Sequence, residues 1–129
     1  MDEITVRDND FYTIKVSIPK NRTYLKIKGF WRHPDLVPDY LDDWNNAMSY
    51  LEKGFTLRTD ASEMKTHPQS VAPLHEQAQA ILIKNGVSKV AEILSDEIAA
   101  LQLNAVAKKT NFPKENFQDL EAAEKWLDS

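Results

Sequence analysis

The chain has 129 residues, no cysteine and a formal net charge of −4, and its length predicts a single domain over residues 1–129. A hydrophobic content of 42% excludes a disordered chain, and the missing cysteines exclude a disulfide scaffold or a cysteine-bound metal centre. The excess of 20 Asp and Glu over 16 Lys and Arg argues against a nucleic-acid partner.

The acidic segment Met1–Ile4 lacks the apolar stretch of a secretory signal. No window approaches the roughly 20 apolar residues that cross a bilayer. These features predict a cytoplasmic protein without a membrane span.

The first half of the chain begins with a predicted hairpin. Residues 11–18 and 23–30 alternate between apolar and polar side chains, and the turn residues 19–22 separate them. From Pro34 the apolar positions recur at steps of three and four, which predicts a helix followed by Gly54 as its stop.

The middle of the chain predicts two further strands around a second helix. Residues 55–59 are typical of a short strand, and 60–70 form a polar connection. A helix is predicted over 73–85 and a strand over 87–94, with Gly86 between them.

The last third predicts a helix, a short strand and a final helix. Ser95 is the predicted N-cap of the first, with Ile98 and Leu101 on its buried stripe. Residues 116–118 predict a strand, and Asp119 is the predicted cap of the helix that ends the chain.

The pattern ββαβαβαβα predicts an α/β fold with a mostly parallel five-stranded sheet and an antiparallel first strand. Because the strands alternate instead of being apolar throughout, we expect sequential strand order and helices packed mainly on one face. The expected open face is half basic and half apolar. Its residues are Lys15, Tyr24, Lys26, Lys28, Phe30, Thr56, Arg58 and Glu92.

Packing motifs give the chain a family resemblance. They are Tyr24–Trp31, Val90–Leu94, Ala100–Leu103, Ala107–Thr110 and, most specifically, Phe117–Leu127. With these segments the chain resembles the SpoIIAA-like proteins of the STAS superfamily, in an uncharacterised branch. The resemblance implies a sheet-and-helix fold with a leading antiparallel strand, as the pattern itself predicts.

Anti-anti-sigma members of this superfamily carry a phosphorylatable serine directly after an Asp. Asp60 matches that Asp, but the next residue is Ala61, and Ser62 lies one place later. The resemblance therefore implies that the phospho-switch serine is not retained at the family position.

The sequence offers little catalytic chemistry. His67, His75 and Glu63 could meet at a zinc ion, but no HExxH spacing exists, and solvated or capping histidines are the simpler interpretation. A hydrolase-type site at Ser62 with a histidine base lacks a Gly-x-Ser-x-Gly elbow. Asp35, Asp39, Asp42 and Asp43 are interpreted as acids of a solvated helix face. We therefore expect no enzyme, no cofactor and no bound metal.

Two functions remain open. The first is a non-enzymatic regulatory module that contacts a protein partner or a second copy. Its candidate contact residues are Lys26, Lys28, Arg58, Asp60 and Ser62. The second is a carrier or sensor of a small apolar ligand, as in the Sec14-like use of a related fold, with Trp31 lining a crevice beside Val71 and Leu74.

Overall fold

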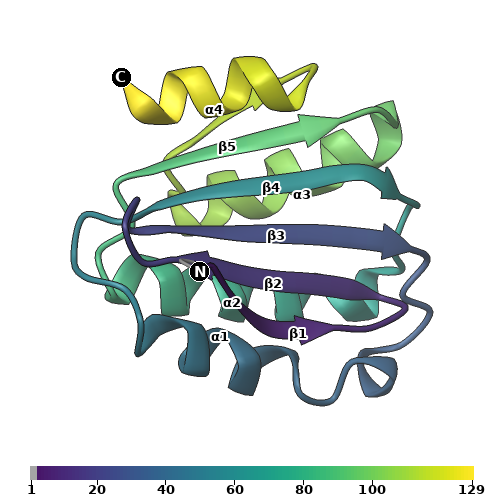
Figure 1. Ribbon diagram of the computed structural model, residues 1–129. Helices are drawn as coiled ribbons and strands as arrows, with labels where there is room; N and C mark the ends of the chain where they lie inside the picture. The colour runs from purple at the N-terminus through teal and green to yellow at the C-terminus, as the bar shows by residue number, and fades with distance from the viewer. Residues whose placement is uncertain (1–2) are drawn as a thin grey trace.

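A computed structural model describes residues 3–129 as one six-stranded sheet with helices on both sides (Figure 1). Its strands, which lie side by side in chain order, are β1 (Glu3–Asp8), β2 (Tyr12–Ser17), β3 (Arg22–Gly29), β4 (Thr56–Met64), β5 (Lys89–Leu94) and β6 (Lys114–Phe117). β2 is antiparallel to both its neighbours, and β3 to β6 are parallel. The predicted class, a mostly parallel sheet in sequential order, is confirmed.

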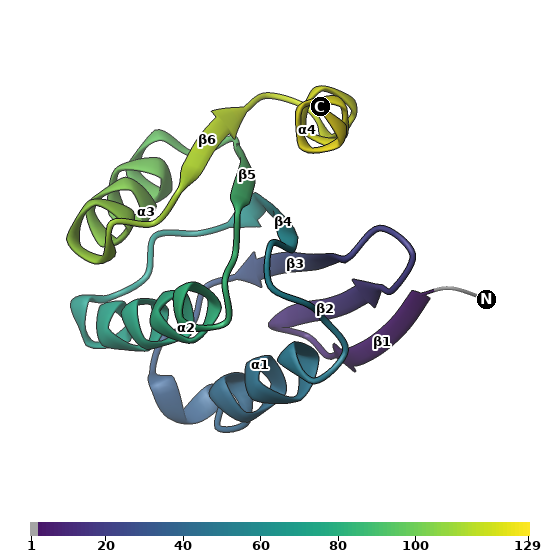
Figure 2. The same cartoon turned by 90° about the vertical axis from the view of Figure 1, so that its left-hand side faces the viewer.

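The helices divide unequally between the two faces of the sheet. They are α1 (Tyr40–Met48), α2 (Ala72–Lys84), α3 (Glu97–Thr110) and α4 (Leu120–Asp128), with single 3-10 turns at Pro34–Leu36 and Gln69–Val71. Figure 2 shows α1, α2 and α3 on one side and α4 on the other. The expectation of helices mainly on one face is therefore confirmed for three of the four.

Two sequence expectations concern the chain end and membrane insertion. The sequence analysis predicted that no secretory signal begins at Met1. Met1 and Asp2 lie outside the described residues. Within residues 3–129, no helix combines the length and apolar character that a bilayer crossing requires.

The strand β1 is the one element that the sequence analysis did not predict, so the sheet has six strands and not five. It is an edge strand, and its side chains are exposed or only half-buried. An edge strand with no fully buried face shows weak apolar alternation, which explains why this segment carries no strand pattern. Its pairing with β2 is interrupted by a bulge between Thr5 and Arg7.

Glu92 on β5 was expected on the open face, and this expectation is wrong. Its side chain is 2% exposed and lies on the α2–α3 side of the sheet, near Leu103, with Nζ of Lys114 2.8 Å away. Burial raises the pKa of this carboxyl. The opposite side of the same strand, Ala91 and Ile93, packs against α4. Because both faces of β5 are covered, the alternation of its residues could not predict which side chains face α4 and which face α2 and α3.

The start of α3 also differs from the expectation. Asp96, and not Ser95, is the N-cap, and its Oδ1 accepts from the backbone N–H groups of Ile98 and Ala99 at 2.8 and 3.1 Å. The predicted stripe residues Ile98 and Leu101 are 59% and 68% exposed. The buried stripe is instead Ala99, Leu103, Val106 and Ala107.

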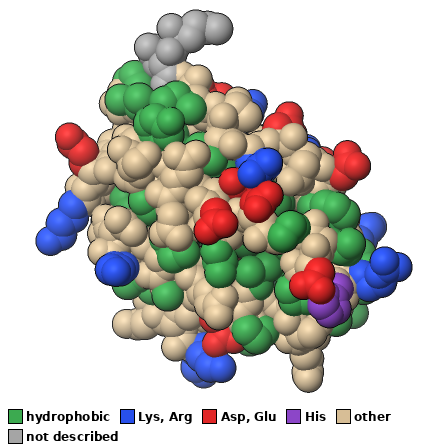
Figure 3. Space-filling model, turned by 90° about the horizontal axis from the view of Figure 1, so that it is seen from below, with side chains coloured by type: hydrophobic (Ala, Val, Ile, Leu, Met, Phe, Trp, Pro, Cys, Tyr) green, Lys and Arg blue, Asp and Glu red, His purple; other side chains and the backbone are tan. Residues whose placement is uncertain are grey.

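The acids around the first helix do not form a single solvated group. Asp35, Asp39 and Asp42 are exposed, but Asp43 is 6% exposed, so the expectation is wrong for Asp43. Its carboxylate accepts two bonds from Arg7, at 2.8 and 3.0 Å, and one from the hydroxyl of Tyr12 at 2.5 Å. On the side shown in Figure 3, the acidic side chains are scattered among apolar and basic ones.

The helix α4 is attached to the sheet by Glu124. Its carboxylate accepts from Arg22 of β3 at 2.6 Å and from Arg58 of β4 at 2.9 Å. Arg22 is 3% exposed and therefore depends on protein partners for its hydrogen bonds. Asp119 caps the helix as predicted, with its Oδ1 accepting from the N–H of Ala122 at 2.7 Å.

Replacing Glu124 with Ala should lower the free energy of unfolding by about 2 kcal/mol, because the buried Arg22 loses a carboxylate partner. Urea denaturation measures the change. Lys125→Ala, at an exposed position of the same helix, is the matched control and should change stability by less than about 0.5 kcal/mol. Equal values for the two variants would contradict the assigned role of Glu124.

Candidate functional site

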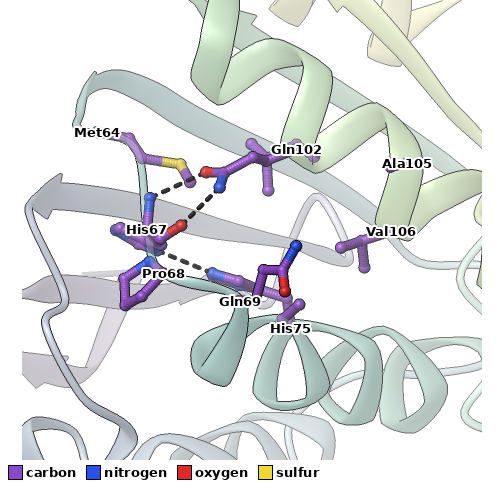
Figure 4. Close-up of a pocket in the computed structure, with 10 residues that line it drawn as sticks. Met64, His67, Pro68, Gln69, His75, Gln102, Ala105 and Val106 are labelled. Carbon is purple, nitrogen blue, oxygen red and sulfur yellow. Dashed lines mark hydrogen bonds between the residues drawn. The ribbon is translucent and has the colours of Figure 1, made fainter.

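Two histidines meet at the carboxyl-terminal edge of the parallel strands. His67 lies in the connection from β4 to α2, and His75 lies in the first turns of α2. Nδ1 of His67 is 3.1 Å from Nε2 of His75, and both side chains are buried (Figure 4). This edge is where ligands commonly bind in open α/β sheets.

Hydrogen bonding fixes which nitrogens of the pair carry protons. Nε2 of His67 lies 3.3 Å from the carbonyl oxygen of Gly29, which can only accept, so this nitrogen carries the proton. Nδ1 of His67 then accepts from the Nε2–H of His75. Nδ1 of His75 bonds no residue between 3 and 129 and remains a free acceptor.

Trp31 forms the wall behind the histidine pair. Its ring stacks at 5.0 Å from the ring of His67 and 5.2 Å from that of His75, with interplanar angles of 20°. The indole Nε1–H donates to the carbonyl of Phe11 at 3.0 Å. Trp31 is fully buried and does not itself line the adjacent cavity. It therefore positions the imidazoles from within the core.

Both imidazoles are neutral at physiological pH. Burial lowers the pKa of His67 to about 4, and burial together with the neighbouring His67 lowers the pKa of His75 to about 3. A proton on either ring would be placed in a poorly solvated site against the other ring. The pair therefore acts as a hydrogen-bonded neutral unit.

A cavity of about 200 Å³ lies beside the pair, between the β4–α2 connection and α3. Gln102 of α3 holds that connection through two bonds to the backbone of His67, 2.9 Å from its N–H and 2.5 Å to its carbonyl (Figure 4). The lining is mostly apolar. It comprises Met64, His67, Pro68, Gln69, Ala72, His75, Gln102, Leu103, Ala105 and Val106.

The zinc hypothesis needs Glu63 beside the two histidines, and the nucleophile hypothesis needs Ser62 bonded to one of them. The structure shows neither arrangement. Glu63 pairs with Lys26 at 2.5 Å and bonds neither histidine within residues 3–129. Ser62 donates to Asp60 at 2.6 Å and bonds no imidazole of the described chain. Within residues 3–129, no three His, Asp or Glu side chains gather as metal ligands.

The predicted basic residues lie together on a second surface. α4 covers β5, β6 and part of β4, and it leaves the same sheet face open over β1 to β3 and the rest of β4, toward the viewer in Figure 1. We call this surface the basic face. It consists of Lys15, Tyr24, Lys26, Lys28 and Arg58 around a shallow groove of about 300 Å³, which Asp8 and Asp60 also line.

Each cation of the basic face has an acidic neighbour. Lys28 bonds Asp8 at 3.1 Å, and Arg58 bonds Glu124 while its guanidinium lies 4.5 Å from the ring centre of Tyr24. The lysine pairs are partly exposed, and such pairs contribute little to stability. An incoming carboxylate can therefore replace the partner of a lysine at small cost.

The expected connection over 60–70 begins later than predicted, because β4 extends through Met64. Asp60 and Ser62 therefore lie in the strand, at a register shift opposite Lys26–Lys28. Ala61, the residue directly after Asp60, is fully buried. Ser62 is exposed, and its backbone carbonyl accepts from the hydroxyl of Ser95 at 2.6 Å.

The sequence analysis interpreted the two histidines as solvated or capping, and this interpretation is wrong, because His67 and His75 are 3% and 6% exposed. A signal existed for His75, because it is in helical phase with the buried Ala78 and Leu82. No local signal exists for His67, which is buried by Trp31 and Gln102 from distant parts of the chain.

No family model matches the chain, and no curated protein sequence matches it. Solved structures do resemble it. An uncharacterized protein of the DUF3478 family with a SpoIIAA-like fold, from Shewanella loihica PV-4, is 16% identical with a TM-score of 0.62, over 94% of this chain and 97% of that one. SiaC of Pseudomonas aeruginosa is 12% identical with a TM-score of 0.57, over 91% and 100% of the two chains. The chain thus has the SpoIIAA-like fold that its packing motifs predict.

Proposed function

We propose that the chain is a non-enzymatic regulatory module that binds an acidic segment of a partner protein on its basic face. The observation that supports this proposal is that α4 does not cover β1 to β3, so that four cations surround an open groove. Because the acidic neighbours of Lys26 and Lys28 are partly exposed, the carboxylates of an acidic ligand can take their place at small cost.

Charge also distinguishes the two partners that the sequence left open. A two-fold dimer through the basic face would place Lys26 and Lys28 of one copy against the same surface of the other. Like charges in opposition oppose such association. A different, acidic chain is therefore the favoured partner, and sedimentation should show a monomer.

The family's phospho-switch has no counterpart in this proposal. Ala61 has no hydroxyl and is buried. Phosphate on the neighbouring Ser62 would stand against the carboxylate of Asp60, which now accepts the serine hydroxyl at 2.6 Å. Regulation then depends on the presence of the partner and not on a serine phosphate.

Binding of a fluorescent octaglutamate peptide, followed by anisotropy at low salt, tests the proposal. Lys26→Glu should weaken binding about fivefold, since reversing one exposed charge changes an ion-pair energy by about 1 kcal/mol. Lys84→Glu makes the same charge change at the exposed end of α2 and should have a smaller effect. Equal weakening by both variants would show a response to net charge alone and reject the basic face as the site.

A second candidate, binding of a small apolar ligand, is supported by one observation. The cavity beside His67 and His75 is mostly apolar and lies at the carboxyl-terminal edge of the sheet. This location differs from the crevice expected beside Trp31, because the indole is buried behind the histidines.

A further inference from the structure

We propose that the cavity beside His67 and His75 binds a small, uncharged, single-ring molecule that carries one hydrogen-bond donor, as in a phenol. This inference rests on the second candidate function and adds the chemical class of the ligand. It is independent of the basic face, which lies on the opposite side of the sheet.

The size and surface of the cavity set the first limit. Its volume is about 200 Å³, and an apolar cavity of roughly 150 Å³ is large enough for benzene. Six of its ten lining residues are apolar, and Met64 supplies a thioether, which packs favourably against aromatic rings. A single substituted ring therefore fits, whereas a long lipid chain does not.

The charges around the cavity set the second limit. Among the described residues that line it, none is Lys, Arg, Asp or Glu. The two imidazoles are uncharged at neutral pH, because burial holds the pKa of each near 3 or 4. A carboxylate or ammonium ligand would lose its hydration without gaining a counter-charge. The ligand is therefore neutral.

The free hydrogen-bonding groups set the third limit. Gln102 uses both ends of its amide on the backbone of His67, and His67 uses both ring nitrogens. Gln69 also lines the cavity, but it is exposed and its amide is open to water, whereas Nδ1 of the buried His75 bonds no residue between 3 and 129 and can only accept in this tautomer. A ligand that donates one O–H or N–H bond satisfies this nitrogen.

Titration of the intact chain with p-cresol, toluene and benzoate at pH 7.5, observed by amide chemical shifts, tests each limit. p-Cresol should bind about fivefold or more tightly than toluene, which has the same ring without a donor, and benzoate should not bind. Equal affinity for toluene would reject the donor while leaving an apolar ligand site. Absence of binding by both neutral compounds would reject the ligand class and the second candidate function together.

Two variants locate the site. Ala105→Phe, at an exposed cavity-lining position, should abolish p-cresol binding by filling the cavity, whereas Lys108→Phe, at an exposed position of the same helix, should preserve it. His75→Phe retains the ring beside Trp31 but removes the acceptor, so it should bind p-cresol and toluene equally. Unchanged p-cresol binding in Ala105→Phe, or an unchanged preference in His75→Phe, would overturn the assignment.

Discussion

Lowering the pH from 7 to 5 should destabilise the protein by about 2 kcal/mol through His75 alone, because its folded-state pKa is about 3 and its ordinary pKa is 6.5. Above pH 6.5 the imidazole is neutral in both the folded and the unfolded state, and no penalty exists. Below pH 6.5 the unfolded chain takes up a proton that the folded protein excludes. Stability therefore falls with pH until the folded pKa is reached, and His67 acts in the same direction.

Urea denaturation at pH 5, 6 and 7 measures this dependence. His75→Phe should reduce the loss of stability between pH 7 and 5, because the unfolded variant has one site fewer to protonate. His33→Asn removes an exposed imidazole and serves as the matched control. The buried Glu92 has a raised pKa and opposes the histidines on acidification, so the difference between variants is the decisive quantity. Identical pH slopes for wild type and His75→Phe would contradict the prediction.

Replacing Asp43 with Ala should lower the free energy of unfolding by about 2 kcal/mol, because its buried carboxylate accepts two bonds from Arg7, whose own side chain is 40% exposed. The substitution also leaves the hydroxyl of Tyr12, 1% exposed, without its acceptor. Since Arg7 belongs to β1, the loss should be accompanied by faster amide hydrogen exchange in that edge strand.

Asp42→Ala is the matched control for this prediction. Asp42 is the preceding residue of α1 and is exposed, so its removal should change stability by less than about 0.5 kcal/mol. Thermal or urea denaturation of both variants gives the comparison. A similar small effect for Asp43→Ala would mean that the bonds to Arg7 and Tyr12 contribute nothing net.

The candidate sites differ in how far the sequence could predict them. Lys26, Lys28 and Arg58 were placed together correctly on one open surface, because side chains two residues apart on a strand share a face. The cavity was not predicted, because its residues come from β4, α2 and α3 and meet only after the crossovers are formed.

The sequence by itself determined the order of the elements from β2 onward and the antiparallel hairpin of β2 and β3, because alternation and turn residues act over a few neighbouring residues. Only the tertiary structure decided the placement of α4, the orientation of β5 and the pairing of His67 with His75. These features depend on which apolar surfaces remain to be covered once the sheet has formed. When a distant segment buries a residue, as Trp31 buries the two histidines, the local sequence around that residue shows no periodic pattern that would predict the burial.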